Sequence, residues 1–223
     1  MVLVLVFAAG CGGSGAGPTT PATGAGPPTA SQLLAKMTGC TQVSSGLYAT
    51  DVEEAPTVAV CGASGAVWWR ADMDIDCDGV TTAECNDSTD PTYQDETSLQ
   101  TSTGEQFNAA TMPYVVIPQV SSRWSYSGSG IELGAVVAVI YNGQVEYGVF
   151  ADTGPAEIIG EASYAMARAV GINPNPLPGI ITGGADSGVT YLVFKGSRVT
   201  PVESHAAAVS LGQELARQFL TNN

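Results

Sequence analysis

The chain has 223 residues, of which 44% are apolar, so it is long enough and apolar enough to bury the core of one sizeable domain. It carries 21 acidic and 7 basic residues, which gives a formal net charge of -14. Such a surface repels nucleic acid and anionic lipid headgroups, so it excludes a nucleic-acid partner and favours a cationic one.

The chain begins with the pattern of an export signal and a tether. Residues 1–11 form a short apolar run, too short to span a membrane, that ends in small residues and Cys11. The stretch FAAGC resembles a bacterial lipidation motif, although Ala8 stands where Leu is usual and no Lys or Arg precedes the run. We therefore expect lipidation at Cys11, with ordinary secretion as the alternative. Residues 12–32 read as a flexible linker and residues 33–223 as an extracellular domain, bound to a membrane only through the lipid.

Four further cysteines are expected to form two disulfides, because the export signal implies an oxidising compartment. Four cysteines allow three pairings. We favour Cys77–Cys85, which closes a short loop, together with Cys40–Cys61. A zinc site is disfavoured, since the cysteine spacings are not CxxC and the single histidine, His205, lies far along the chain. We expect neither a metal nor a cofactor.

Residues 57–79 read as a strand, a glycine turn and a second strand. Side chains along the second strand alternate between two faces. The face expected to be apolar carries Val67, Trp69, Ala71, Met73, Ile75 and Cys77. The other face carries Trp68, Arg70, Asp72, Asp74, Asp76 and Asp78.

The aspartates of this second strand resemble the opening of a calcium loop. Asp74, Asp76 and Asp78 alternate and are followed by Gly79, as in D-x-D-x-D-G. The closing glutamate of such a loop would stand at Cys85, and no helical pattern flanks the segment. The pattern therefore disfavours calcium.

Nine acids and no Lys or Arg fall between residues 72 and 96. Like charges at alternate positions of one strand repel each other, so their presence is better explained by a cationic ligand than by a merely solvated face. A polymer of amino sugars fits. We expect one tryptophan, Trp68, to stack on sugar rings and the other, Trp69, to lie in the core. The expected contacts to the amines are Asp72, Asp74, Asp76 and Asp78.

Further along the chain, residues 134–152 read as a hairpin whose turn is Asn142-Gly143. Residues 189–197 read as another strand. Ser163 is a suitable N-cap for a short helix, and residues 201–220 have the apolar spacing of a C-terminal helix. The mixture predicts a mainly β protein, a β-rich α+β fold.

The stretch GVFADTGPAEIIGEAS, residues 148–163, places Asp152 and Glu161 nine positions apart around a Gly-Pro turn. A tight turn with incidental acids is one interpretation. The other is the acid–base pair of an inverting glycosidase, which needs two carboxyl groups roughly 6.5–9.5 Å apart. A strand–loop–strand excursion of this length can hold two acids at that separation.

Four stretches, ADMDIDCDG, DPTYQDETS, MPYVVIP and YGVFADTGPAEIIGEAS, together resemble the chitosanases of glycoside hydrolase family 75. The resemblance runs from about Cys40 to Ser197. It implies inverting cleavage of β-1,4 bonds between glucosamine units and places the essential acids at Asp152 and Glu161, in the D-x-G-P and G-E-x-S motifs. Glu161 would be the general acid and Asp152 the general base, although the roles could be exchanged.

A looser similarity to double-psi β-barrel proteins of the rare lipoprotein A and expansin type implies one domain built as a six-stranded double-psi-like barrel with a few short helices and a C-terminal helix. We therefore expect a monomeric endo-chitosanase acting on chitosan. The alternatives are a lytic transglycosylase-like barrel enzyme acting on peptidoglycan, and a non-catalytic expansin-like wall-binding module. The negative charge of peptidoglycan disfavours both.

Overall fold

The structure is a computed structural model that describes residues 26–177 and 183–223. The expected export signal and lipidation site at Cys11 lie outside the described residues. The folded part begins earlier than residue 33, because α1 (Ala30–Ala35) starts inside the expected linker. Thr29 and Gln32 form a capping box at its start, and Ala30 is buried, so these residues belong to the domain.

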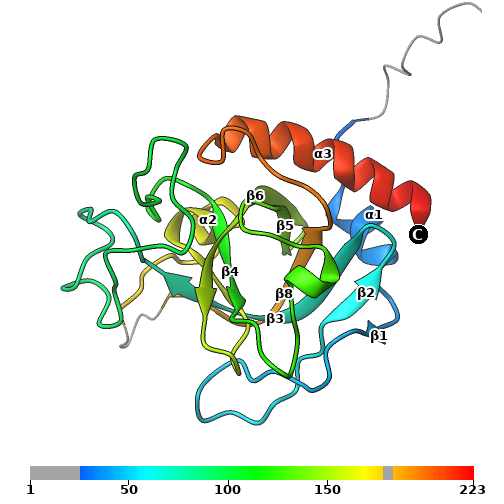
Figure 1. The fold of residues 1–223 in the computed structure, drawn as a ribbon, viewed down its shortest axis with the longest axis horizontal. Helices are drawn as coiled ribbons and strands as arrows, with labels where there is room; N and C mark the ends of the chain where they lie inside the picture. Colours follow the sequence, from blue (N-terminus) through cyan, green and yellow to red (C-terminus); the bar gives the residue numbers. More distant parts are fainter. Residues whose placement is uncertain (1–25, 178–182) are drawn as a thin grey trace, which may run out of the picture.

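Six strands close into a barrel, as expected from the sequence (Figure 1). In order around the barrel they are β3 (Ala66–Asp76), β7 (Glu161–Ser163), β4 (Tyr114–Pro118), β6 (Gln144–Gly154), β5 (Val136–Tyr141) and β8 (Ala185–Phe194). Pairing of β8 with β3 completes the closure. The β3–β7 and β4–β6 pairs are parallel, and the other pairs within the barrel are antiparallel. Two short strands, β1 (Thr41–Gln42) and β2 (Cys61–Ala63), extend the sheet beyond β3.

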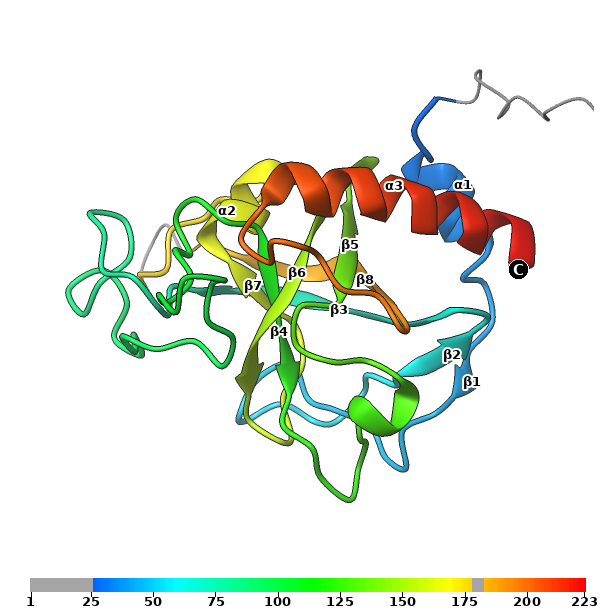
Figure 2. The same cartoon turned by 45° about the horizontal axis from the view of Figure 1, so that its top comes forward.

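Few helices accompany the barrel, and the longest lies across its outer surface. Helix α3 (His205–Asn222) runs over β5 and β6, with α1 beside it, as Figures 1 and 2 show. The short helix α2 (Tyr164–Ala169) follows β7 directly, and η1 (Ser127–Ser129) is a single 3-10 turn. The Ser163 side chain accepts a hydrogen bond from the backbone N–H of Met166, which confirms Ser163 as the cap of α2.

Two apolar clusters hold the elements together, one on each side of the barrel wall. The interior cluster contains Trp69, which stacks on Tyr191 at 5.3 Å between ring centroids and meets Trp124 edge-on. Trp69 is fully buried, as expected. The outer cluster lies between the wall and the helices, where Ala208 and Phe219 of α3 are buried.

Turns and disulfides follow the local sequence closely. The β5–β6 hairpin turns at Asn142 and Gly143, whose φ angles of 46° and 82° both lie in the left-handed region. Cys40–Cys61 and Cys77–Cys85 are the two disulfides, and these are the pairs favoured from the sequence. Among the described residues, no helix combines the length and apolar character needed to cross a membrane.

Candidate active site

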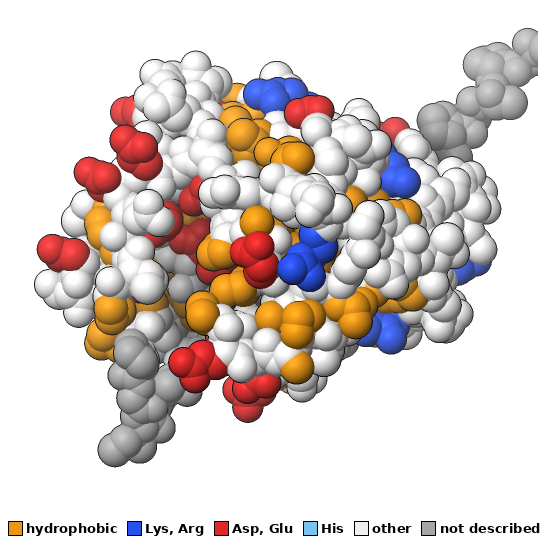
Figure 3. Space-filling view, turned by 60° about the horizontal axis from the view of Figure 1, so that its bottom comes forward, with side chains coloured by type: hydrophobic (Ala, Val, Ile, Leu, Met, Phe, Trp, Pro, Cys, Tyr) orange, Lys and Arg blue, Asp and Glu red, His pale blue; other side chains and the backbone are white. Residues whose placement is uncertain are grey.

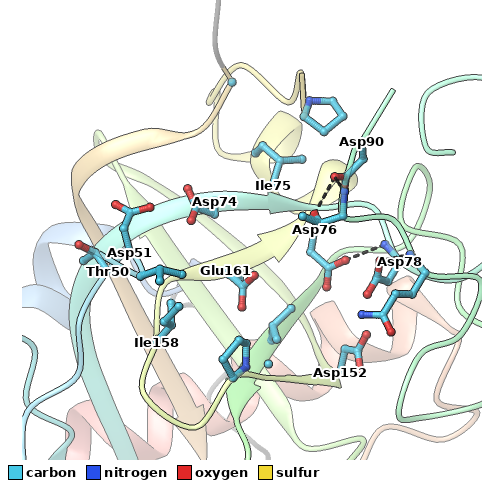
Figure 4. A pocket seen from close by; sticks show the side chains of 18 of the residues that line it. Thr50, Asp51, Asp74, Ile75, Asp76, Asp78, Asp90, Asp152, Ile158 and Glu161 are labelled. Atoms are coloured by element: carbon cyan, nitrogen blue, oxygen red, sulfur yellow. Dashed lines mark hydrogen bonds between the residues drawn. The ribbon is translucent and has the colours of Figure 1, made fainter. Parts of the chain in front are cut away.

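A cleft of ≈ 640 Å³ opens on the outer surface of the barrel, beside β3, β7, β4 and β6. Figure 3 shows acidic side chains inside a hollow on this face, and Figure 4 shows them in close view. Among the described residues, seven carboxyl side chains line the cleft, and no Lys, Arg or His does. They are Asp51, Asp74, Asp76, Asp78, Asp90, Asp152 and Glu161.

Strand pairing places four cleft residues in one row across the barrel wall. Val116 of β4 pairs with Asp152 of β6 on one side and with Glu161 of β7 on the other, and Glu161 pairs in turn with Asp74 of β3. Paired residues point to the same face of a sheet. Neighbouring strands lie about 4.8 Å apart, so Asp152 and Glu161 stand two strand spacings, or about 10 Å, from each other at their Cα atoms. A substrate chain can lie over Val116 with one acid on either side.

A β-bulge directs Asp152 into this row. The β4–β6 register shifts between Val115, which pairs with Phe150, and Val116, which pairs with Asp152, so Ala151 is the extra residue. Without the shift, strict alternation would turn the side chain of Asp152 to the face opposite Val116. Bulges commonly re-aim a side chain beside an active site in this way.

One carboxylate oxygen of Asp152 accepts three hydrogen bonds. Its Oδ1 accepts hydrogen bonds from the Ser98 N–H at 2.9 Å, the Ser98 hydroxyl at 2.6 Å and the Thr153 N–H at 2.7 Å. Donors of this kind stabilise negative charge on a carboxylate.

Glu161, unlike Asp152, lies in surroundings that favour the protonated form of its carboxyl group. Its carboxyl lies against Gly154, where a Cβ atom would come within 2.6 Å of Oε2. Burial, followed by the charges of Asp74, Asp78 and Asp152, raises the pKa of Glu161 to about 7. This carboxyl group therefore still carries a proton at mildly acidic to neutral pH, as a general acid requires.

The remaining carboxyls make the cleft a site for cations. Burial and the Asp152 and Asp90 charges raise the pKa of Asp78 to about 7, and burial raises the pKa of Asp76 well above its ordinary value. Carboxylate oxygens of Asp76, Asp78 and Asp152 lie within 4.8 Å of one another. A hard cation such as Ca²⁺ or a protonated amine would relieve this repulsion.

Two residues expected to contact substrate do not line the cleft. Trp68 is 6% exposed, packs in the outer cluster, and lies under the Arg70 guanidinium at 5.4 Å, so its ring is not placed for the expected stacking on sugars in the cleft. Arg70 also donates a hydrogen bond to the backbone oxygen of Met37, just after α1. The segment around α1 thus covers the part of this β3 face that carries Trp68 and Arg70. Asp72 is 5% exposed and is not part of the cleft lining. Alternation identified the face correctly but could not show what covers it.

Of the other expected contacts, the structure brings Asp74, Asp76 and Asp78 into the cleft. Three participating residues were not singled out from the sequence. Asp90 and Ser98 are the first and last residues of the stretch DPTYQDETS, which was a usable signal. Asp51 lies on the segment between β1 and β2 and enters the cleft by tertiary packing alone, with no signal in the sequence.

Two carboxyls that flank one residue of a barrel wall, one of them with a pKa raised to about 7, form the arrangement that glycoside hydrolysis uses. Residues 73–219 match the family model described as fungal chitosanase of glycosyl hydrolase group 75. The match covers well over half of the chain, and the chain belongs to this family.

Similar curated proteins are named as endo-chitosanases. The chain is 31% identical over 138 residues to endo-chitosanase B of Aspergillus oryzae, 30% over 141 residues to an endo-chitosanase of Aspergillus fumigatus, and 32% over 161 residues to endo-chitosanase C of Aspergillus oryzae. These matches cover 59%, 57% and 68% of the chain. They span 56%, 59% and 35% of the relatives' own lengths.

The raised carboxyl pKa values predict an unusual pH dependence of stability. In the folded protein the pKa is about 8 for Asp72 and about 7 for both Asp78 and Glu161, against ordinary values of 3.8 to 4.5. At pH values between the ordinary and the raised pKa values, the folded state binds more protons than the unfolded chain. The free energy of unfolding therefore falls as pH rises. We expect Tm to fall between about pH 5 and pH 8, measured by thermal unfolding, and the Asp78→Asn variant to show a shallower fall. A wild-type Tm that rises over this range would contradict the assignment.

Proposed function

We propose that the protein is an inverting endo-chitosanase that hydrolyses β-1,4 bonds between glucosamine units. The observation that carries the proposal is the row in which Asp152 and Glu161 flank Val116 across two strand spacings. Such a spacing leaves room for a water molecule between one carboxylate and the sugar, which inversion requires. The relatives named as endo-chitosanases support the choice of substrate.

In this mechanism each acid has one role. Glu161 donates its proton to the glycosidic oxygen while the bond from that oxygen to the anomeric carbon breaks. A water molecule attacks the same carbon from the opposite side, and Asp152 accepts the proton that the water loses. The three donors on Oδ1 of Asp152 and the burial of Glu161 favour this assignment over the exchanged one.

The charge of the cleft supports a cationic polymer. Seven carboxyls and no basic side chain line its described part, so protonated glucosamine units are attracted and anionic polymers are repelled. Release of reducing ends from chitosan, chitin and peptidoglycan, assayed side by side, tests the proposal. We expect chitosan to be the preferred substrate. Preference for peptidoglycan would favour a lytic transglycosylase-like enzyme, and inactivity on all three would favour a wall-binding module.

Contacts to substrate amines are proposed for the cleft aspartates. Asp74→Asn and Asp78→Asn should each raise KM for chitosan by about 2- to 5-fold, since an exposed charge contact contributes ~0.5–1 kcal/mol. The effect should shrink in high salt, because salt screens such contacts. Glu157→Gln is the matched control, since Glu157 is exposed and lies outside the cleft lining.

Calcium provides the discriminating measurement for the same aspartates. Under the amine-binding proposal, adding Ca²⁺ leaves the Tm of the wild type nearly unchanged. A strong rise in Tm that disappears in Asp78→Asn would instead assign the Asp76, Asp78 and Asp152 trio to a metal ion. A salt-independent KM in the aspartate variants would also contradict amine contacts.

We propose extracellular localisation with a lipid anchor at Cys11, on the strength of FAAGC and the linker that follows. The two disulfides support export. Metabolic labelling with a fatty acid should mark the wild type and not Cys11→Ser. Equal labelling of both proteins, or of neither, would remove the anchor and leave ordinary secretion.

A further inference from the structure

Asp72 is a buried carboxyl beside the proposed acid, and the mechanism above gives it no role. It is 5% exposed, and its Oδ1 has no hydrogen-bond partner among the described residues. An ionised carboxylate in such a position would lose its hydration without compensation. The group is therefore expected to be neutral, which does not suit a contact to a protonated amine.

The side chain of Asp72 packs against Gly160, the residue directly before Glu161. A Cβ atom at Gly160 would overlap Oδ1 of Asp72 and would lie 3.2 Å from the Cβ of Ala71. Gly160 also has a φ of 131°, which side chains of L residues rarely permit. The carboxyl of Asp72 thus fills the space that a side chain at position 160 would take.

The other end of Asp72 is fixed to the barrel interior. The Tyr191 hydroxyl donates to the backbone oxygen of Asp72 at 2.8 Å, and the Tyr191 ring stacks on Trp69. Both rings are fully buried. The position of Asp72 is consequently set by a rigid, close-packed core rather than by the cleft surface.

This contact lies at the residue directly before Glu161. The backbone oxygen of Gly160 accepts a hydrogen bond from the Asp74 N–H at 2.8 Å, and the Asp72 carboxyl packs against the same residue. From there the Glu161 side chain extends to Gly154, and its carboxyl packs closely enough that a Cβ atom at position 154 would overlap it. A small shift of Gly160 would therefore move the proton donor.

We propose that Asp72 is a positioning residue for Glu161: its neutral carboxyl packs against Gly160 and fixes the backbone from which the acid projects. The proposal rests on the proposed function only for the catalytic role of Glu161. It replaces the expectation that Asp72 contacts the substrate.

The negative charges around Asp72 favour the neutral, protonated form of its carboxyl group. Burial, followed by the negative charges of Asp74 and Asp51 and by that of Glu161, raises the pKa of Asp72 to about 8. From β8, the group that faces Asp72 is the Tyr191 hydroxyl, which donates to its backbone oxygen. Above about pH 8, Asp72 ionises, and a charge then appears beside Gly160 and Glu161.

Kinetics of three variants test the role. Asp72→Asn keeps the size and neutrality of the side chain, so kcat and KM on chitosan should stay within about 3-fold of wild type. Asp72→Ala empties the contact with Gly160 and should lower kcat about 10-fold or more with little change in KM, since small displacements of catalytic groups are costly. Asp74→Asn, on the same strand but in the cleft, is the matched control and should raise KM instead.

The pH profile separates positioning from simple loss of packing. Above about pH 8, log kcat of the wild type should fall more steeply than that of Asp72→Asn, which cannot ionise at this position. Superimposable slopes would contradict the proposal. A rise in KM for Asp72→Asn as large as that for Asp74→Asn would make Asp72 a substrate contact, and an unchanged kcat in Asp72→Ala would remove its role.

Crystal structures of the variants decide the proposal even if chitosan is not the substrate. In Asp72→Ala, or in the milder Asp72→Ser if the alanine variant does not fold, the Glu161 carboxyl should leave its place against Gly154. In Asp72→Asn it should stay. An undisplaced Glu161 in the alanine or serine variant would overturn the proposal. Failure of the wild type to release reducing ends from chitosan would overturn the proposed function alone.

Discussion

Glu161→Gln and Asp152→Asn should each lower kcat on chitosan by about 10²-fold or more, with the fold intact. A positioned acid or base contributes about 10²- to 10⁴-fold, and each amide keeps the shape of the side chain while removing its proton chemistry. Burial and neighbouring charges raise the pKa of Glu161 to about 7, which supports its proposed role as the proton donor. Initial rates of reducing-end release measure kcat, and unchanged thermal unfolding curves confirm folding.

The loop between the two acids contains a natural control. Glu157 is exposed and lies outside the described cleft lining, so Glu157→Gln should stay within a few-fold of wild type. The anomer released early in the reaction, observed by NMR, should be inverted. Retention of configuration would exclude water activation by Asp152, and a fully active Glu161→Gln would end the assignment of the acid.

Gly154→Ala should lower kcat about 10-fold or more without unfolding the protein. The new methyl group would stand 2.6 Å from Oε2 of Glu161 and 3.1 Å from the Val116 side chain. The Glu161 carboxyl is the end of a flexible side chain, so it moves aside and leaves the position proposed for proton donation. Steady-state kinetics on chitosan and crystallography of the variant measure the two parts of this expectation.

Gly39→Ala is the matched control for Gly154→Ala. Gly39 has open space at its Cβ position, and like Gly154 it lacks a positive φ, so alanine is accommodated at both sites by the backbone. The control should keep full activity. A Gly154→Ala enzyme with wild-type kcat would show that the position of the Glu161 carboxyl is less restricted than its contacts indicate.

The glycines of the two motifs show why short patterns can locate a site without explaining it. The D-x-G-P and G-E-x-S stretches identify Asp152 and Glu161, but neither pattern shows that Gly154 receives the carboxyl of Glu161 or that Gly160 receives that of Asp72. These contacts join segments distant in the chain. They follow from how the strands associate, which a local pattern does not encode.

Local sequence by itself determined the elements of this protein that depend on neighbouring residues. Asn142-Gly143 permits left-handed backbone and therefore turns the hairpin, while Ser163 supplies the oxygen that caps α2. The spacing of apolar residues over 201–220 was enough to indicate the C-terminal helix, observed as α3. Alternation along β3 separated Trp69 from the aspartate face for the same reason, since it is a property of the extended chain.

The tertiary structure decided which groups on each face meet the cleft. Trp68 shares the face of the aspartates, yet the chain around α1 buries it, and Asp72 is enclosed at Gly160. The orientation of Asp152 depends on a bulge opposite Val116, which is a feature of strand pairing. Exposure, register and the protonation of buried acids depend on groups brought together from distant segments, so only the closed barrel could fix them.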